Sequence, residues 1–290
     1  MRTVLALMMT LLLTGCAAAS MTMVENDPRP AEEALVEAQE ETVRYTVTIG
    51  EWSDEAQTEE GIPLAGYVFR LPVLTPVRKD GTVIETARNE SEERALAVTA
   101  VFNEKFEKWA AAEDFAEMVE SAEEDLSWRE MEGIEWFGGY ELDLSCTAYQ
   151  TDHLVSVYGT YYANTGGAHP NTWFLGWNFD LEDGVFFEAD VLSDNAELQN
   201  AVAAEIIRQA GAPAEDGYVP IEMYWEDHEA IIANWTSYAV TFDEAGMRVV
   251  FSPYELAPYA AGPQEFLLSY EWLGPHLGDH GRTLLDLEDN

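Results

Sequence analysis

The sequence has few cysteines and few basic residues. Its 290 residues contain two cysteines, Cys16 and Cys146, so no set of disulfide bonds can brace the fold. Lys and Arg number 14 against 55 Asp and Glu, which gives a formal net charge of −41. A surface this acidic repels the phosphates of nucleic acid, which excludes nucleic acid as a partner, and it attracts cationic proteins. The alternative is a general adaptation to a saline habitat, in which the acidic surface has no specific partner.

Long apolar runs are also missing after the first residues, so no later segment is expected to span a membrane. The apolar run at residues 4–13 follows a basic start and is too short for a membrane-spanning helix. It leads into Leu13-Thr14-Gly15-Cys16, which resembles the lipobox of bacterial lipoproteins. We therefore expect residues 1–15 to be a signal peptide and Cys16 to be acylated, with membrane lipid as the partner of its acyl chains. The alternative is an ordinary secretory signal with a chance cysteine.

The expected location follows from this lipid anchor. The protein is expected to be exported and lipid-anchored to the cell envelope, facing the periplasm. Ala17 stands where an aspartate commonly retains lipoproteins at the inner membrane, which favours the outer membrane if the organism is Gram-negative. Residues 16–42 are small, acidic and interrupted by prolines, and we expect them to form a flexible tether.

The remainder of the chain is apolar enough to fold, because 47% of all residues are hydrophobic and 12% are aromatic. Predicted strands and helices come in blocks, which favours an α+β fold with mostly antiparallel sheet. The periodicity predicts helices at residues 90–121, 195–210 and 226–234, and strands at residues 43–49, 62–74, 140–149, 154–162, 171–181, 185–187, 235–242, 247–251 and 265–270. We expect a subdomain with a long helix at residues 43–165, a second with one or two helices packed on its sheet at residues 166–275, and a tail at residues 276–290.

Apolar periodicity defines a buried face in the long helix and in one strand. The helix stripe recurs every three or four positions and predicts core packing for Leu96, Thr99, Phe102, Phe106 and Trp109. In the strand at residues 140–149, Leu142, Leu144, Cys146 and Ala148 share one face at a period of two. Cys146 is therefore expected to be a buried thiol and not a nucleophile.

The histidines do not form a recognisable metal site. His228-Glu229 lacks the second histidine, at position 232, that a metalloprotease helix requires. His276 and His280 are four residues apart, but the glycines and the proline around them break the helix that would align them. The sequence also lacks nucleotide-binding and serine-nucleophile motifs, and we expect neither a metal nor a cofactor.

Two loops stand out as candidates for ligand binding. In residues 161–172, paired glycines permit positive φ, and a histidine offers one hydrogen-bond donor and one acceptor. Residues 251–263 form a loop shaped by proline and glycine that carries several aromatic residues. The candidate ligand-binding residues are Gly166, Gly167, His169, Asn171, Tyr254 and Tyr259. The structural alternative is that the histidine bonds backbone carbonyls to lock its turn, and that the tyrosines close the core.

Three motifs in this region carry a resemblance to a family of envelope domains. They are Thr165-Gly166-Gly167-Ala168-His169, Asn178-Phe179-Asp180-Leu181 before Gly184, and the loop Tyr254-Glu255-Leu256-Ala257-Pro258-Tyr259-Ala260-Ala261-Gly262. In order and spacing they are similar to the extracellular domain of lysozyme-sensing anti-sigma factors (RsiV type). They are also similar to the non-catalytic N-terminal region of certain peptidoglycan deacetylases (PdaC type). Residues 71–74 and the following helix resemble the partner domain that usually lies upstream, so the resemblance covers residues 43–273.

The chain departs from both relatives. The expected lipid on Cys16 replaces the transmembrane helix of the anti-sigma factors, so no output across the membrane is expected. Thr241-Phe242-Asp243-Glu244-Ala245-Gly246 is similar to the motif that opens deacetylase catalytic domains, but it lies in an expected hairpin with too little chain after it. Deacetylase activity is therefore not expected.

The resemblance implies a non-enzymatic binding module whose ligand is a cationic protein such as lysozyme, or a peptidoglycan fragment. A second hypothesis is a hydrolase or transferase on wall glycan, with His169 and a nearby carboxylate as general base. A third is a purely structural lipoprotein. An open cleft with a carboxylate beside His169 favours the enzyme, whereas a ring bonded to backbone carbonyls favours the structural alternative.

Overall fold

A computed structural model describes residues 43–111, 114–193, 197–214 and 217–287. The expected signal peptide at residues 1–15, the lipidated Cys16 and the tether at residues 16–42 lie outside these residues. The fold is α+β, as predicted, with a six-stranded sheet and a three-stranded sheet. Within the described ranges, no helix has the length and apolarity to cross a membrane.

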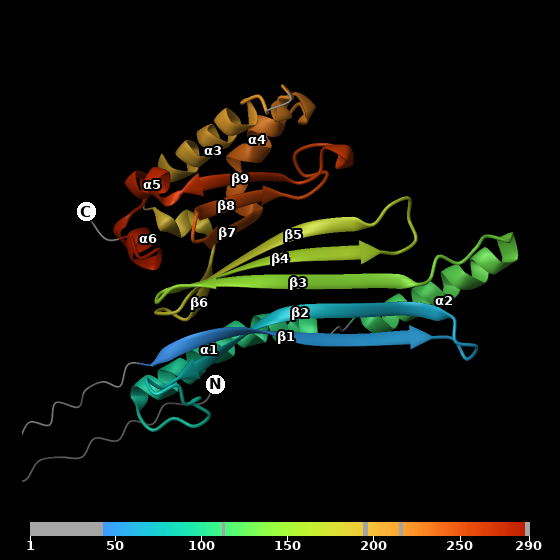
Figure 1. The fold of residues 1–290 in the computed structure, drawn as a ribbon, viewed down its shortest axis with the longest axis horizontal. Coiled ribbons are helices and arrows are strands. Elements are labelled where there is room, and N and C mark those ends of the chain that lie inside the picture. The colour runs from blue at the N-terminus through green and yellow to red at the C-terminus, as the bar shows by residue number, and fades with distance from the viewer. Residues whose placement is uncertain (1–42, 112–113, 194–196, 215–216, 288–290) are drawn as a thin grey trace, which may run out of the picture. The chain divides into compact units, whose positions relative to one another are not determined.

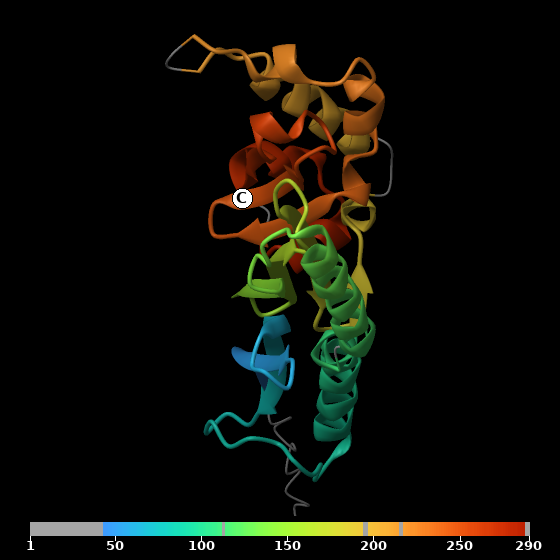
Figure 2. The same ribbon diagram turned by 90° about the vertical axis from the view of Figure 1, so that its right-hand side faces the viewer.

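The larger sheet has the strand order β1-β2-β3-β4-β5-β6 (Figure 1). Its strands are β1 (Arg44–Gln57), β2 (Pro63–Val77), β3 (Tyr140–Gln150), β4 (Leu154–Asn164), β5 (Asn171–Asp180) and β6 (Val185–Phe187). Neighbouring strands are antiparallel except β2 and β3, which are parallel. A parallel pair requires a long crossover, and here two helices, α1 (Glu90–Ala110) and α2 (Phe115–Glu132), supply it. Both helices lie along one face of the sheet (Figure 2).

The helix predicted at residues 90–121 is two helices, so its predicted extent was wrong. The predicted stripe does pack into the core: Phe102 and Phe106 are fully buried against the sheet. The stripe ends at Trp109, because residues 110–114 contain no large apolar side chain to continue it. Asp114, a residue type that favours helix starts, then stands at the N-cap of α2.

A side-chain amide from α1 completes an open strand edge. β3 pairs with β2 only from Ala65 to Arg70, so among the described residues no strand lies on that side of the second half of β2. There Asn103 of α1 accepts a hydrogen bond from the Leu74 N–H at 2.9 Å and donates one to the Leu74 carbonyl at 3.0 Å. Prolines are tolerated in this part of β2, as expected where a ladder is incomplete.

The smaller sheet has the order β7-β8-β9, from strands β7 (Ala239–Asp243), β8 (Gly246–Phe251) and β9 (Gln264–Ser269). Four helices pack around it: α3 (Glu197–Ala210), α4 (His228–Ala233), α5 (Tyr270–Leu273) and α6 (Asp279–Leu284). The strand predicted from residue 235 begins only at Ala239. Trp235–Ser237 forms a 3-10 turn, because the fully buried Trp235 ring fills the core under α3 and bonds the Gln199 carbonyl at 3.1 Å.

A buried polar network joins the two sheets. Ser156 of β4 and Asn178 of β5 are direct partners in the larger sheet, and both side chains are buried. The Ser156 hydroxyl accepts a hydrogen bond from the Phe242 N–H at 2.8 Å and donates one to Asn178 Oδ1 at 2.8 Å. Asn178 Nδ2 donates to the Val240 carbonyl at 2.9 Å. These two side chains satisfy the edge of β7 as a neighbouring strand would.

The backbones of the two sheets also approach closely. A Cβ atom at Gly176 of β5 would lie 2.5 Å from the Val240 carbonyl oxygen, so only glycine fits there without a shift. The expected subdomain boundary between residues 165 and 166 falls between β4 and β5, inside the larger sheet.

The C-terminal residues pack against the smaller sheet. In the expected tail at residues 276–290, α6 buries Leu284, and Leu285 follows it into the same core. A Cβ at Gly281 would lie 2.4 Å from the Leu192 carbonyl, so α6 contacts the chain that leads into α3.

The start of α1 yields a prediction about pH. Glu92 lies in the first turn of α1, 1% exposed, and receives hydrogen bonds from the Arg78 guanidinium at 2.7 and 2.9 Å. The Arg78 hydrogen bonds hold the pKa of Glu92 below its ordinary value of 4.5. Because the folded pKa is depressed, this contribution to stability is complete above about pH 4.5 and is lost as pH falls further.

We expect Glu92→Gln to unfold at lower urea than the wild type at pH 7, and the difference to shrink as pH falls below 4.5. Urea midpoints measured from pH 7 to pH 3 check this, with the exposed neighbour substitution Glu93→Gln as control. A difference that stays constant across this range would contradict the assignment.

Candidate functional site

Three of the candidate ligand-binding residues form one aromatic cluster, His169, Tyr254 and Tyr259. His169 Nδ1 lies 2.9 Å from the Pro170 carbonyl, so this nitrogen is the donor, and Nε2 accepts from the Tyr254 hydroxyl at 3.2 Å. The imidazole stacks on the Tyr259 ring, with centroids 3.9 Å apart and an interplanar angle of 16°. The cluster ties the β4–β5 turn to the loop between β8 and β9.

The loop at residues 252–262 covers the free edge of β5. The Ser252 hydroxyl accepts from the Phe174 N–H at 3.1 Å, and the Tyr259 hydroxyl donates to the Pro170 carbonyl at 3.3 Å. β6 pairs only with the last three residues of β5, so these side chains protect an edge that would otherwise be open.

Tyr254 is the exposed member of the cluster, with 54% of its surface accessible. Its φ of +74° is rare for a residue with a side chain. The conformation is held by the Trp225 indole, which donates to the Tyr254 carbonyl at 3.1 Å, and by the Tyr254 N–H, which donates to the Ala257 carbonyl at 3.1 Å. Strained backbone positions of this kind cluster at functional sites, which keeps Tyr254 a candidate binding residue.

The other candidate residues lie apart from this cluster. Gly166 has a φ of +76°, and a Cβ there would meet the Phe137 ring at 2.5 Å. Its carbonyl accepts from Arg129 of α2 at 3.2 Å, which makes Gly166 a structural glycine. Gly167 is exposed in the turn, and Asn171 is exposed at the start of β5, opposite Ala163.

The surroundings of His169 match the alternative in which the histidine holds its turn in place through hydrogen bonds and is not a catalytic base. Among the described residues, no carboxylate forms a hydrogen bond or ion pair with its ring. One nitrogen contacts a backbone carbonyl and the other a tyrosine hydroxyl, so neither is directed at a carboxylate as a general base would be.

The thiol and three of the other histidines lie within secondary-structure elements. Cys146 is 6% exposed, and burial raises the pKa of its thiol to about 12, which leaves almost no thiolate near neutral pH. His228 Nδ1 contacts the Trp225 carbonyl at 2.8 Å. His276 lies in a 3-10 turn and His280 in α6, so they do not share a helix. In the part of the chain that the structure describes, no group of three or more His, Cys, Asp or Glu residues is placed to hold a metal ion.

A cleft of about 430 Å³ lies between β3, β4 and the β7–β8 hairpin. Its cation, Arg248, is held by Asp243 at 2.5 Å and by Glu265. Burial and the charge of Glu265 raise the pKa of Tyr158 in the cleft to about 12. The charges of Arg248, Asp243 and Glu265 therefore compensate one another within the cleft. Asp243, part of the stretch similar to a deacetylase motif, also accepts from the Ala245 N–H at 2.7 Å and so shapes the hairpin turn.

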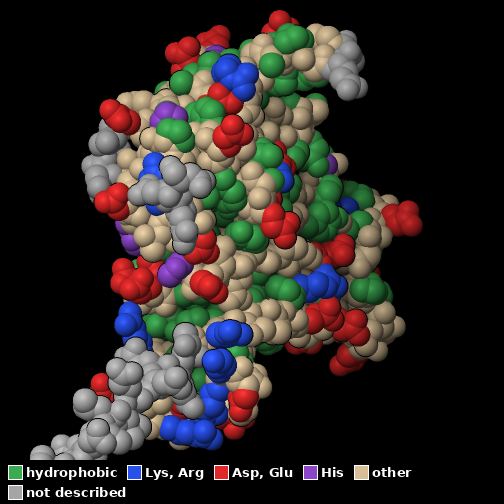
Figure 3. Space-filling view, turned by 60° about the vertical axis from the view of Figure 1, so that its left-hand side comes forward, with side chains coloured by type: hydrophobic (Ala, Val, Ile, Leu, Met, Phe, Trp, Pro, Cys, Tyr) green, Lys and Arg blue, Asp and Glu red, His purple; other side chains and the backbone are tan. Residues whose placement is uncertain are grey.

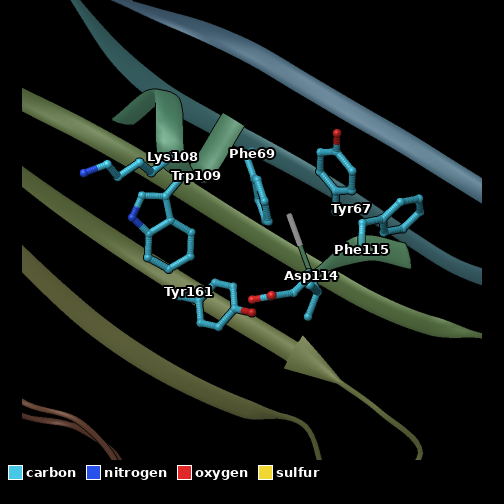
Figure 4. A pocket seen from close by; sticks show the side chains of 8 residues that line it. Tyr67, Phe69, Lys108, Trp109, Asp114, Phe115 and Tyr161 are labelled. Atoms are coloured by element: carbon cyan, nitrogen blue, oxygen red, sulfur yellow. The ribbon is translucent and has the colours of Figure 1, made fainter. Parts of the chain in front are cut away.

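A second hollow, of about 310 Å³, lies on the helix-covered face of the larger sheet, where α1 ends and α2 begins (Figure 4). We call it the aromatic hollow. Five rings line it, with Lys108, Asp114 and Leu142: Tyr67, Phe69, Trp109, Phe115 and Tyr161. Sequence reasoning assigned Trp109 to the core stripe and missed the hollow, because it depends on the break between the two helices.

Replacing His169 with Ala is expected to lower the free energy of unfolding by about 1–2 kcal/mol, because the substitution removes a ring stack and a hydrogen bond between two loops. Urea denaturation of both proteins measures this. The matched control is His280→Ala, whose ring is half exposed and approaches Asp180 only to 3.8 Å. Unchanged stability, together with loss of an activity on wall glycan, would contradict the structural role.

Comparisons with known proteins place this fold beside domains without an assigned function. The DUF3298 family, described as a protein of unknown function, matches residues 187–271, less than a third of the chain. No curated protein matches the sequence. The crystal structure of a DUF3298 family member from Bacteroides fragilis is 15% identical and has a TM-score of 0.54, with 85% of this chain and 98% of that chain covered.

A DUF3298 family protein from Pseudomonas aeruginosa is 17% identical, with 81% of this chain and 94% of that chain covered and a TM-score of 0.44. At these identities the Bacteroides structure supports the fold alone. The chain therefore contains a segment similar to DUF3298, residues 187–271, and shares the fold of a member of that family over most of its length.

Proposed function

We propose that this chain is a non-catalytic binding module of the cell envelope, held at a membrane by lipid on Cys16, and that it binds a cationic protein such as lysozyme. The observation that carries the proposal is the charge balance of the surface. The sequence holds 55 acidic and 14 basic residues. Such a potential steers a strongly basic partner and speeds its association.

The cations are few, and six of the fourteen form ion pairs with Asp or Glu among the described residues, which leaves the acidic residues in large excess. Intrachain ion pairs with Asp or Glu are formed by Arg70, Arg78, Lys108, Arg129, Arg208 and Arg248. Figure 3 shows Asp and Glu side chains across the visible face, with many of the Lys and Arg side chains gathered toward its lower part. Most exposed carboxylates are therefore available to a partner.

The resemblance to lysozyme-sensing extracellular domains gives the partner class. Two of its three motifs meet in one region: the turn at residues 165–169 and the loop at residues 254–262 share the cluster of His169, Tyr254 and Tyr259. Tyr254 is its exposed ring, and tyrosine is frequent among the residues that dominate protein interfaces. In this proposal the cluster positions the binding loop and does not perform catalysis.

Calorimetric titration of the full chain, purified in detergent, with a c-type lysozyme at about 20 mM salt tests the proposal. We expect saturable binding. Peptidoglycan fragments form the second arm of the experiment, since they are the alternative ligand and are not strongly cationic. Absence of lysozyme binding at low salt would overturn the cationic-protein assignment, and binding of fragments alone would replace it.

The anchor is tested separately. Cys16→Ser is expected to remove acyl labelling, because the thiol that carries the acyl chains is replaced. Cys146→Ser is the matched control and is expected to leave labelling intact. Acyl labelling that persists without Cys16 would contradict the lipid anchor.

A further inference from the structure

The rings of the aromatic hollow form the walls of a box. The rings of Phe69 and Trp109 stand at 90° with centroids 6.1 Å apart, and those of Tyr67 and Phe115 at 77° and 5.0 Å. Trp109 and Tyr161 meet at 60° and 5.5 Å. A sugar stacks on one flat exposed ring, whereas a compact cation is held best when the negative faces of several rings surround it. The steep angles favour the cation.

The hollow also contains a carboxylate that its own helix does not use. Asp114 is the N-cap residue of α2, yet its side chain makes no capping hydrogen bond. Figure 4 shows the Asp114 carboxylate and the Tyr161 hydroxyl pointing toward one another between the rings. Burial, and then the negative charge of Asp114, raises the pKa of Tyr161, in agreement with this proximity.

The cation at the rim does not occupy the hollow. The side chain of Lys108 is 73% exposed, its ammonium lies 3.8 Å from Glu104, and in Figure 4 it points away from the rings. A volume of about 310 Å³ is at the small end of ligand pockets, which suits one long side chain.

We propose that the aromatic hollow receives a lysine or arginine side chain of the cationic partner, with the rings of Trp109 and Tyr161 around its charged end and Asp114 as the counter-charge. The inference deepens the proposed function and rests on it for the identity of the partner. It adds a specific contact to the general attraction of the acidic surface.

Small probes test the hollow without lysozyme. The full chain in detergent is titrated by ligand-observed NMR with N-acetyl-lysine methylamide, its norleucine analogue, which lacks the charge, and N-acetylglucosamine. We expect millimolar binding of the lysine probe and at least tenfold weaker binding of the norleucine probe. Equal binding of the two amides, binding of N-acetylglucosamine alone, or no binding of any probe would overturn the proposal.

Substitutions then locate the site. Asp114→Asn keeps the shape of the side chain, and we expect it to weaken binding of the lysine probe about fivefold. Trp109→Phe keeps an aromatic wall of smaller area and is expected to weaken binding less than Trp109→Ala. Asp152→Asn, in the exposed β3–β4 turn, is the control and should leave the affinity unchanged. Loss of affinity in the control equal to that in Asp114→Asn would contradict a local site.

Lysozyme titration of the same variants separates this inference from the proposed function. If lysozyme binds the wild type and Asp114→Asn with equal affinity, the proposed binding function is supported and the proposed role of the aromatic hollow is wrong. If lysozyme does not bind the wild type, both the proposed function and the assignment of the partner are wrong. A fivefold or larger loss in Asp114→Asn supports both.

Discussion

Replacing Asn178 with Ala is expected to lower the free energy of unfolding by about 2–4 kcal/mol. The substitution removes the bond to the Val240 carbonyl and the bond from the Ser156 hydroxyl, both at buried positions between the sheets. A buried acceptor left without a donor costs more than the net value of the hydrogen bond it loses, and a cavity adds to that cost. For a domain of this size the expected fall in Tm is roughly 5–15 °C.

The control for this prediction is Asn171→Ala, which makes the same chemical change at an exposed position of β5. Its effect is expected to stay within about 0.5 kcal/mol. Ser156→Ala should fall between the two, because the Phe242 N–H loses its acceptor while the Asn178–Val240 bond remains. Equal stability of Asn178→Ala and Asn171→Ala would show that the network does not hold the sheets together.

The affinity for lysozyme is expected to fall at least tenfold when the salt concentration rises from about 20 to 200 mM. The Debye length shrinks from roughly 20 to roughly 7 Å over this range, which screens attraction to exposed carboxylates. The loss should come mainly from a slower association rate, because long-range steering governs encounter. Surface plasmon resonance at several salt concentrations measures both rate constants.

An affinity that is independent of salt would contradict a partner recruited by charge. The alternative of a saline habitat makes a different prediction, because a merely salt-adapted surface has no specific complex with lysozyme at any concentration. An unrelated acidic protein of similar charge serves as the control, since non-specific attraction alone would reproduce its titration.

Local patterns were sufficient to predict much of the fold. The alternation in β3 correctly placed Leu144 and Cys146 in the core, although Ala148 of the same predicted face is exposed. The helix stripe correctly placed Phe102 and Phe106 in the core. Both signals arise from neighbours in the sequence, whose side chains must share a face at a period of two or 3.6. The break between α1 and α2 was missed because charged residues on a helix surface do not themselves end a helix.

Local patterns of this kind do not predict the contacts between segments that are distant in the sequence. The sequence singled out His169, Tyr254 and Tyr259, but the pairing of residues 85 positions apart in the chain depends on the whole topology. Asn178 was noticed only as part of a motif, and its role in satisfying β7 requires knowledge that the two sheets meet there. The aromatic hollow likewise joins β2, α1, α2 and β4, which no local window contains.

We propose that this acidic module binds a cationic protein through the charge of that protein. Parallel titrations of the full chain with native lysozyme and with lysine-acetylated lysozyme, at the same low salt, test it most directly. We expect saturable binding of the native protein and at least tenfold weaker binding of the acetylated form, because acetylation removes the positive charges. Equal binding of the two forms, or no binding of the native protein, would contradict the claim.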